Sequence, residues 1–300
     1  MKTLAFVLLA ACAMDPMTDG SDTLEQETAS TQYVSIFDFP KTDQGAYYDL
    51  EQKLNQEFVK TGGYSAITPL SFYCSVTSKL GTVHDCAWTF ASSQVGVDGT
   101  TAAIGIDAPT YQCHVHPHMS SVKLIAALTD ADDAIHTTLP GMGTIADSFT
   151  DCFNNPIGST PITVGGGTTY VEAGSYYSTP ANQKKWLDAK ADLKLGFDNV
   201  CGDTFCGSDF NDLQSLTFAC AITKSSGNVK SCAWTFGGSF GEVATNGAVA
   251  PTSKTFTCNV NMHGTLGQLI TTLTGAGAGA INAPLPGLQT STYDALTCLP

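Results

Sequence analysis

The chain has 300 residues, 43% of them hydrophobic and only 13% charged, which is enough apolar material for packed cores and excludes a wholly disordered protein. All 13 basic residues are lysines and 27 residues are acidic, so the net charge of −14 argues against nucleic-acid or phosphate ligands, which need cationic donors. Eleven cysteines indicate an oxidising compartment and a structure held by disulfides.

Residues 1–11 are predicted to be an export signal, because Lys2 precedes an apolar run that is too short to span a bilayer. The run ends in Leu9-Ala10-Ala11-Cys12, which resembles the lipobox of bacterial lipoproteins. The resemblance implies that Cys12 carries a lipid and that the lipid bilayer is a partner through it. Because Ala13 follows the cysteine, it also implies the outer membrane. The alternative is ordinary cleavage after Ala13, which gives a soluble secreted protein.

An internal duplication organises the rest of the chain. Residues 12–30 are acidic and polar and are predicted to be a flexible tether, followed by a first repeat domain at 31–153, a linker at 154–167 and a second repeat domain at 168–300. The pentapeptide CAWTF, the tripeptide LPG and the pattern TxYV occur once in each repeat. Four cysteines recur 145 or 146 residues later, namely Cys74, Cys86, Cys113 and Cys152 as Cys220, Cys232, Cys258 and Cys298.

Each repeat is predicted to contain an antiparallel meander. Alternating aromatic and β-branched residues predict strands at 69–78 and 82–96 around a turn at 78–81, and the second copy places this turn at 225–228. A further turn signal precedes a third strand that ends near His116.

Helices are predicted on both sides of the meander. The early helix has apolar residues on one face, which are Leu50, Leu54 and Phe58 in the first copy and Trp186, Leu193 and Phe197 in the second. The later helix begins at Ser120 or Ser121 and is expected to bury Val122, Ile125 and Leu128. Closing segments at 144–153 and 290–298 carry the last cysteine of each repeat.

These elements predict the α+β class, with two homologous, disulfide-stapled domains. Each would consist of a helix, a three- to four-stranded antiparallel meander and a second helix, with the helices on one face of a small sheet. The order of elements resembles cystatin-like architecture in shape, which implies a secreted inhibitor as one alternative function.

The cysteines are predicted to pair within each repeat. A hairpin that turns at residue 80 sets Cys74 opposite Cys86, which leaves Cys113 for Cys152, although four cysteines allow three connectivities. The predicted bridges are Cys74–Cys86, Cys113–Cys152, Cys220–Cys232, Cys258–Cys298 and, within one short loop, Cys201–Cys206. They leave Cys12 as the odd cysteine, in agreement with its lipidation.

The histidines of the third strand form a candidate metal site. His114 and His116 lie on the same face of a strand and offer two imidazoles to an ion such as zinc, with His118 or His84 as a third ligand. The alternative is that these histidines simply face solvent. Because His118 recurs as His263, a structural role at the junction with the following helix is also expected for it.

An acidic loop in the second repeat is a candidate calcium site. Asp203, Asp209 and Asp212 provide the oxygen ligands that calcium prefers, but their spacing is not that of an EF-hand, and solvation of an acidic surface explains them equally well.

The chain has no motif for nucleophilic catalysis, nucleotide binding or a metalloprotease. The residues common to both repeats are of core and turn types, so Trp88 and Trp234 are predicted to be core anchors. We therefore expect a cell-envelope lipoprotein that acts as a non-catalytic binding or structural module, without a required cofactor, whose partner is an unknown surface ligand or envelope protein. The alternative enzyme is a metal-dependent hydrolase that uses the histidine strand of the first domain.

Overall fold

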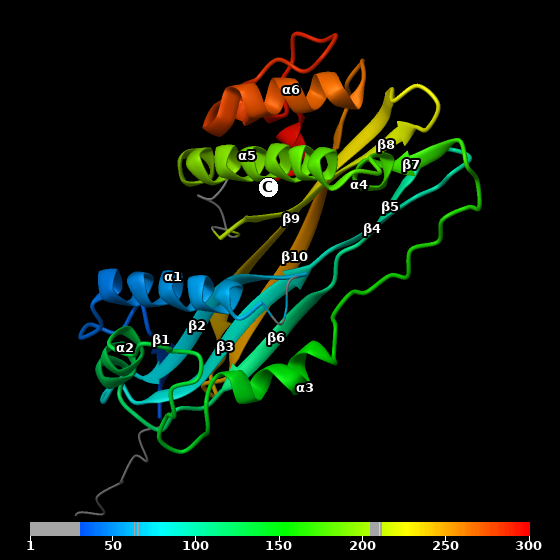
Figure 1. Cartoon of the computed structure of the whole chain (residues 1–300). Coiled ribbons are helices and arrows are strands. Elements are labelled where there is room, and N and C mark those ends of the chain that lie inside the picture. The colour runs from blue at the N-terminus through cyan, green and yellow to red at the C-terminus, as the bar shows by residue number, and fades with distance from the viewer. Residues whose placement is uncertain (1–30, 63, 65, 205–209, 211) are drawn as a thin grey trace, which may run out of the picture. The chain divides into compact units, whose positions relative to one another are not determined.

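The first repeat folds into a four-stranded antiparallel sheet with the strand order β1-β2-β3-β6. The computed structural model describes residues 31–62, 64, 66–204, 210 and 212–300 of the chain (Figure 1). The elements of this repeat are β1 (Tyr33–Ser35), α1 (Gln44–Lys60), β2 (Ile67–Thr77), β3 (Val83–Ser92), β4 (Gln94–Val97), β5 (Ile104–Asp107), β6 (Thr110–Val115), α2 (Ser121–Thr129), the 3-10 helix η1 (Ala146–Ser148) and α3 (Phe149–Phe153).

The second repeat has the same topology, with a sheet of order β10-β9-β8-β7. Its elements are β7 (Tyr170–Glu172), α4 (Ala173–Tyr176), α5 (Pro180–Thr204), β8 (Gln214–Thr223), β9 (Val229–Val243), β10 (Val249–Val260), α6 (Leu266–Ala276) and the 3-10 helices η2 (Gly277–Asn282) and η3 (Tyr293–Cys298). The chain is therefore an α+β protein built from two homologous, disulfide-stapled units. None of the described helices has the length and apolar character needed to cross a membrane.

The two repeats differ in their long hairpin, which is formed by β9 and β10 in the second repeat and by the segment from β3 to β6 in the first. In the second repeat β9 and β10 are continuous, whereas in the first repeat β4 and β5 form a separate two-stranded sheet. Pro109, which has no amide hydrogen to donate to a strand ladder, lies between β5 and β6.

The repeated pattern TxYV forms an edge strand in both copies, which the sequence analysis did not assign. In β1, Tyr33 pairs with Thr77 of β2, and in β7, Tyr170 pairs with Thr223 of β8. The sheets therefore gain their fourth strand from residues that precede the first helix.

Each repeat has its own hydrophobic core between its helices and one face of its sheet. Helix α1 buries Leu50, Leu54 and Phe58 as predicted. Helix α2 begins after the N-cap Ser120, but the prediction for Val122 was wrong, because this side chain is 54% exposed. Leu124 is buried in its place, since it follows Ser121 by three residues and precedes Leu128 by four on the inner face.

Four disulfides lie within the described residues and confirm the predicted pairing, namely Cys74–Cys86, Cys113–Cys152, Cys220–Cys232 and Cys258–Cys298. The first and third of these bridges join directly opposite residues of a hairpin. The second and fourth join the third strand of a repeat to its closing segment. The predicted Cys201–Cys206 bridge involves Cys206, which lies outside the described residues.

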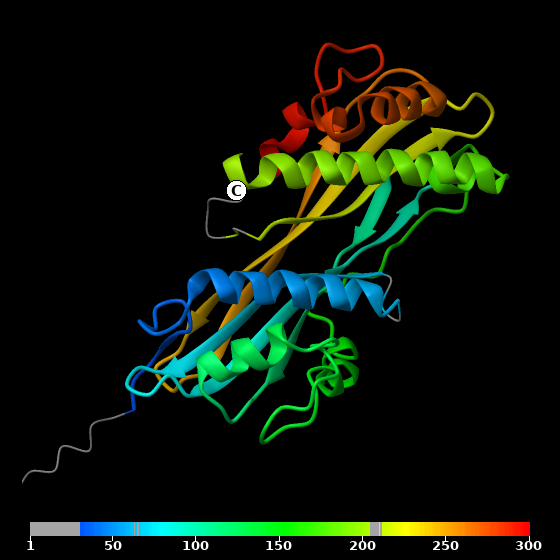
Figure 2. The same ribbon diagram turned by 60° about the vertical axis from the view of Figure 1, so that its left-hand side comes forward.

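The long hairpin of each repeat runs along the sheet of the other repeat (Figures 1 and 2). Ser71 and Thr89 alternate with core residues in β2 and β3, so they lie on the sheet face that is turned away from the helices. This face meets Ser239 of β9, whose hydroxyl lies 2.7 Å from the hydroxyls of both Ser71 and Thr89. All three residues are fully buried. The segment from Gln32 to Pro300 thus forms one compact unit with two cores.

The hairpin turns dock at corresponding positions of the opposite repeat. The Val249 amide of the β9–β10 hairpin donates to the Asp85 carboxylate at 2.8 Å. Conversely, Ser231 donates from its hydroxyl to the Ala102 carbonyl of the β4–β5 hairpin at 3.1 Å. Asp85 and Ser231 correspond, because each immediately precedes the cysteine of CAWTF.

The predicted linker is also held in place. The carboxylate of Asp107 accepts hydrogen bonds from the Ser159 hydroxyl at 2.9 Å and the Thr160 amide at 2.7 Å. Asp98 accepts a further bond from the Gly165 amide at 2.8 Å. The segment at 154–167 is therefore hydrogen-bonded along the surface of the first repeat and does not act as an untethered linker between the two repeats.

The duplication provides a matched pair of tryptophans. Trp88 and Trp234 are both buried, but only the Trp234 indole donates a hydrogen bond, to the Ser215 hydroxyl at 2.8 Å. Pro69 stands at the position of Ser215 in the first repeat, and the Trp88 indole N–H has no partner among the described residues.

We expect Trp234→Phe to cost about 1 kcal/mol more free energy of unfolding than Trp88→Phe, because only the former breaks a buried hydrogen bond. Urea unfolding of the two variants measures the difference. Equal losses at the two positions would contradict this assignment.

Candidate functional site

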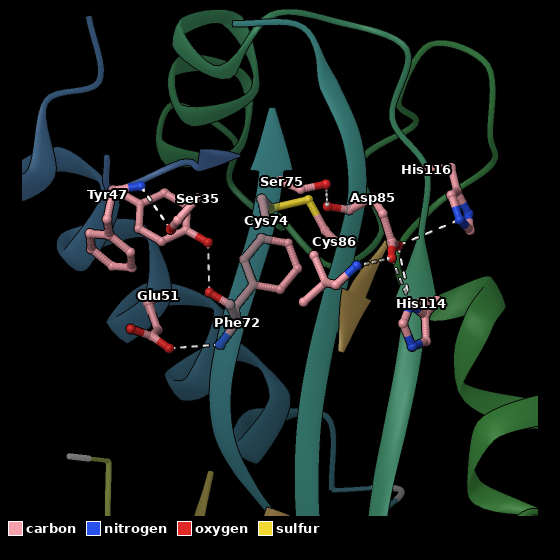
Figure 3. The surroundings of a disulfide bond; sticks show 12 residues. Ser35, Tyr47, Glu51, Phe72, Cys74, Ser75, Asp85, Cys86, His114 and His116 are labelled. Carbon is pink, nitrogen blue, oxygen red and sulfur yellow. Dashed lines mark hydrogen bonds and ion pairs between the residues drawn. A yellow bond between two sulfur atoms is a disulfide. The ribbon is translucent and has the colours of Figure 1, made fainter. Parts of the chain in front are cut away.

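The histidine strand meets a buried carboxylate on the neighbouring strand (Figure 3). His114 on β6 and His116, just after the end of β6, lie on one face, and β3 presents Asp85 beside them. The Nδ1 atom of His114 lies 3.1 Å from both carboxylate oxygens of Asp85, and Nε2 of His116 lies 3.4 Å from one of them. Asp85 is only 3% exposed. Its carboxylate contacts both histidines and also accepts the hydrogen bond from the Val249 amide of the other repeat.

These contacts shift the ionisation of the cluster. Burial of Asp85 opposes ionisation, but the hydrogen bonds from His114 and Val249 and the charges of both histidines outweigh it and hold the pKa of Asp85 below its ordinary value. The hydrogen bond to Asp85 raises the pKa of His114, against the effect of burial. The pair is thereby favoured in its charged, hydrogen-bonded form.

The structure does not bring the other predicted metal ligands to this cluster. The His84 ring packs against Tyr33 in a tilted arrangement with ring centroids 4.5 Å apart, and His118 lies at Gly141 of the LPG loop. In the part of the chain that the structure describes, no group of three or more His, Cys, Asp or Glu side chains is arranged to hold a metal ion. The strand geometry directs His114 and His116 to Asp85 instead.

His118 and His263 have the same backbone contact in the two repeats. The His118 amide donates to the carbonyl of Pro140 at 2.8 Å, and the His263 amide donates to the carbonyl of Pro286 at 3.0 Å. Both prolines belong to an LPG tripeptide. The repeated histidine thus lies where the end of the third strand is tied to the LPG loop, which favours the structural role.

The predicted calcium loop falls largely outside the described residues. This applies to Asp209 and to the side chain of Asp203. Asp212 is described, and one of its carboxylate oxygens accepts a hydrogen bond from the Tyr73 hydroxyl at 3.3 Å. The same hydroxyl lies 2.8 Å from the backbone carbonyl of Ser239. Asp212 therefore faces the junction between the repeats.

A second buried carboxyl group lies at the edge of β2 (Figure 3). Glu51 of α1 accepts the backbone N–H of Phe72 at 2.7 Å, and Tyr47, one helical turn earlier, donates its hydroxyl to the Phe72 carbonyl at 2.6 Å. Strand β1 is too short to pair with this part of β2. The two helix side chains therefore satisfy backbone groups that the sheet leaves open.

Burial makes this carboxyl group hard to ionise. Burial and the negative charge of Asp212 raise the pKa of Glu51 to about 8, although the Phe72 N–H acts in the opposite direction. Burial also raises the pKa of Asp212, against the hydrogen bonds that it accepts. The two acids thus oppose each other's ionisation at the junction of the repeats.

Two clefts occupy corresponding places in the two repeats, between the third strand and the disulfide-linked closing segment, and most of the residues that line each of them have polar side chains. The first cleft has a volume of about 540 Å³ and is lined by Gln112, His114, Ser148, Asp151, Cys152, Asn155 and Ile157. The second has a volume of about 260 Å³ and is lined by Asn259, Asn261, Thr290, Ser291, Asp294, Ala295 and Thr297. Asn259 takes the place of His114, and Asp294 takes the place of Ser148.

Sequence reasoning missed two central residues, Asp85 and Glu51. Asp85 gave a signal, since Ser231 replaces it while the CAWTF motif beside it is unchanged. Glu51 also gave one, because an acid one turn after Tyr47 interrupts the buried face of an amphipathic helix. The chain matches no protein-family model, no curated protein and no solved structure.

Proposed function

We propose that this protein is an exported bacterial lipoprotein, anchored to the outer membrane by a lipid on Cys12, that binds an envelope or surface ligand without a chemical step. The observation that carries the binding function is the presence of clefts at corresponding places in both repeats. The clefts differ in their side chains, whereas the surrounding scaffold is the same.

The cysteines support export and anchoring. Four intramolecular bridges favour an oxidising compartment, since disulfides persist outside the reducing cytosol. With a fifth bridge between Cys201 and Cys206, Cys12 is the one cysteine left for a lipid. The net charge of −14 and the absence of arginine favour partners other than nucleic acid.

The common scaffold supports binding over catalysis. The residues that both repeats retain are the bridging cysteines, the buried tryptophans and the LPG turns, all of which serve the fold. Among the described residues that line the two clefts, no set of chemically reactive side chains is common to both. This pattern is typical of a duplicated binding module.

Replacing Cys12 by serine should release the protein from membranes, because the lipid supplies the anchor. Fractionation with carbonate extraction and intact mass measure the change, and the wild-type chain should carry the added lipid mass. If Cys12→Ser still sediments with membranes, the anchor reading fails. About one transition metal per purified wild-type chain would instead favour the metal-dependent hydrolase.

A further inference from the structure

In each cleft, the third strand of the repeat presents hydrogen-bonding side-chain groups that have no described partner, and they start from corresponding positions, His114 in the first repeat and Asn259 in the second. In the second repeat, Asn259 and Asn261 are two residues apart on and just after β10, so their side chains lie on one face. Both are exposed, and no described residue bonds to either carboxamide. Each carboxamide offers two donor hydrogens and one acceptor oxygen.

The opposite wall of the second cleft adds hydroxyl and carboxylate groups. Asp294 accepts the amide and the hydroxyl of Ser291 through one oxygen, at 2.7 Å and 2.9 Å, and its other oxygen stays open. The hydroxyls of Thr290 and Thr297 make no hydrogen bond with other described side chains. The cleft therefore offers donors and acceptors on both walls.

The first cleft has a comparable set of open groups. The bond from His114 Nδ1 to Asp85 leaves Nε2 of the same ring without a described partner, while the ring lines the cleft. Asn155 donates from its amide nitrogen to the Asp151 backbone carbonyl at 2.7 Å, which leaves its side-chain oxygen open. The Asp151 carboxylate is exposed and unpaired among the described residues.

The linings exclude several classes of ligand. Neither described lining contains a lysine, and the charge of His114 in the first cleft is already paired with Asp85, whereas each lining contains an exposed aspartate. An anionic group would therefore meet a carboxylate without an unpaired counter-charge. Ile157 and Ala295 are the main apolar side chains, which is too little for a lipid chain. A single exposed carboxylate in each cleft would contribute little binding free energy toward a cation, because an exposed ion pair is weak in water. Neutral polar ligands remain.

We propose that the two clefts bind neutral, polyhydroxylated chains, that is, uncharged saccharide units of an envelope or surface polysaccharide. The proposal rests on the proposed function and names the ligand of the same clefts. A sugar hydroxyl both donates and accepts, which matches carboxamide, hydroxyl and carboxylate side chains.

The fixed arrangement of the repeats gives the pair of clefts an avidity effect. The bonds from Val249 to Asp85 and from Ser231 to Ala102 lock the repeats into one unit. A polymer bound in one cleft therefore meets the second without the entropy cost of ordering a linker, provided that its length spans both clefts. Polymers should consequently bind more tightly than short oligosaccharides.

The test uses the purified full-length chain and measures co-sedimentation with cellulose, chitin and starch, with heparin-agarose, polylysine-agarose and phosphatidylglycerol vesicles as charged probes. The variant Asn259→Ala/Asn261→Ala alters the second cleft and Asp151→Ala the first. Asn282→Ala removes an exposed carboxamide of the same repeat outside both clefts and is the matched control. Circular dichroism checks that each variant is folded.

We expect retention on at least one neutral polysaccharide, a loss of about tenfold in affinity for either cleft variant and no change for Asn282→Ala. Retention that both cleft variants leave unchanged, or binding to charged probes only, overturns the saccharide assignment but leaves a binding function in place. Failure to bind any of these probes, together with failure to bind isolated cell envelopes, overturns the saccharide assignment and the proposed function together.

Discussion

Replacing Glu51 by leucine should lower the free energy of unfolding by about 3 kcal/mol, because the buried Phe72 N–H loses its acceptor. Glu51 is 8% exposed and lies in the core-facing row of α1, so no water replaces the carboxylate. The neighbouring bond from Tyr47 to the Phe72 carbonyl would remain and hold only one side of the strand edge. Urea unfolding at pH 5, where the wild-type carboxyl group is neutral in the folded state, measures the loss.

The Glu51→Gln variant tests the ionisation of the same site. Because the folded protein raises the pKa of Glu51 from 4.5 to about 8, it binds a proton that the unfolded chain releases between these values. Wild-type stability should therefore fall as the pH rises from about 5 to about 8, and the raised pKa of Asp212 acts in the same direction. Glutamine keeps an acceptor for Phe72 but does not titrate, so Glu51→Gln should flatten much of this decline.

The control for Glu51 is Asp49→Asn, which removes an exposed carboxylate from the same helix. We expect this variant to follow the wild-type pH profile. A Glu51→Gln profile as steep as that of the wild type would show that Glu51 is ionised in the folded protein and would overturn this account of the junction.

Replacing Ser239 by leucine should destabilise the protein by about 3 kcal/mol, because the larger side chain has no space between the two sheets. It would also remove the hydroxyl that lies 2.7 Å from both Ser71 and Thr89. Ser239→Ala should cost only about 1 kcal/mol, since Thr89 keeps its bond to the Ser71 carbonyl at 3.0 Å. Urea unfolding and limited proteolysis within residues 154–167 measure the two effects.

Thr252→Leu is the matched control for Ser239→Leu. Thr252 pairs with Phe240 in the same hairpin but is exposed, so added bulk there meets solvent. This variant should unfold within about 0.5 kcal/mol of the wild type. If Ser239→Leu and Thr252→Leu unfold at the same urea concentration, the sheets do not pack through Ser239.

Local patterns in the sequence predicted much of the fold. The midpoint between Cys74 and Cys86 coincides with the hairpin turn, so the cross-strand bridge followed from register alone. The four-residue spacing of Leu50, Leu54 and Phe58 likewise identified the buried face of α1. The same reasoning was wrong for Val122, because an apolar residue one position beyond the inner face points to solvent.

The candidate site could be predicted from the sequence only in part. Strand alternation placed His114 and His116 on one face, but it did not reveal Asp85, which comes from a neighbouring strand. Periodicity also gave no reason to place Asp212 near Glu51, since Asp212 precedes β8 of the second repeat and Glu51 lies in α1 of the first. Contacts of this kind depend on how the repeats dock.

The sequence by itself determined the duplication, because motifs and cysteines recur at an offset of 145 or 146 residues. It also predicted the hairpin bridge of each repeat and the buried face of α1, because these depend on short spacings within one hairpin or one helix. Tertiary structure alone decided that the two sheets pack together. Ser71, Thr89 and Ser239 are small and polar, so their alternation with core residues is that of a solvent-facing sheet surface. They can be buried because the hydroxyl groups of one repeat form hydrogen bonds with the hydroxyl group of the other. These bonds join residues that are more than 140 positions apart in the sequence.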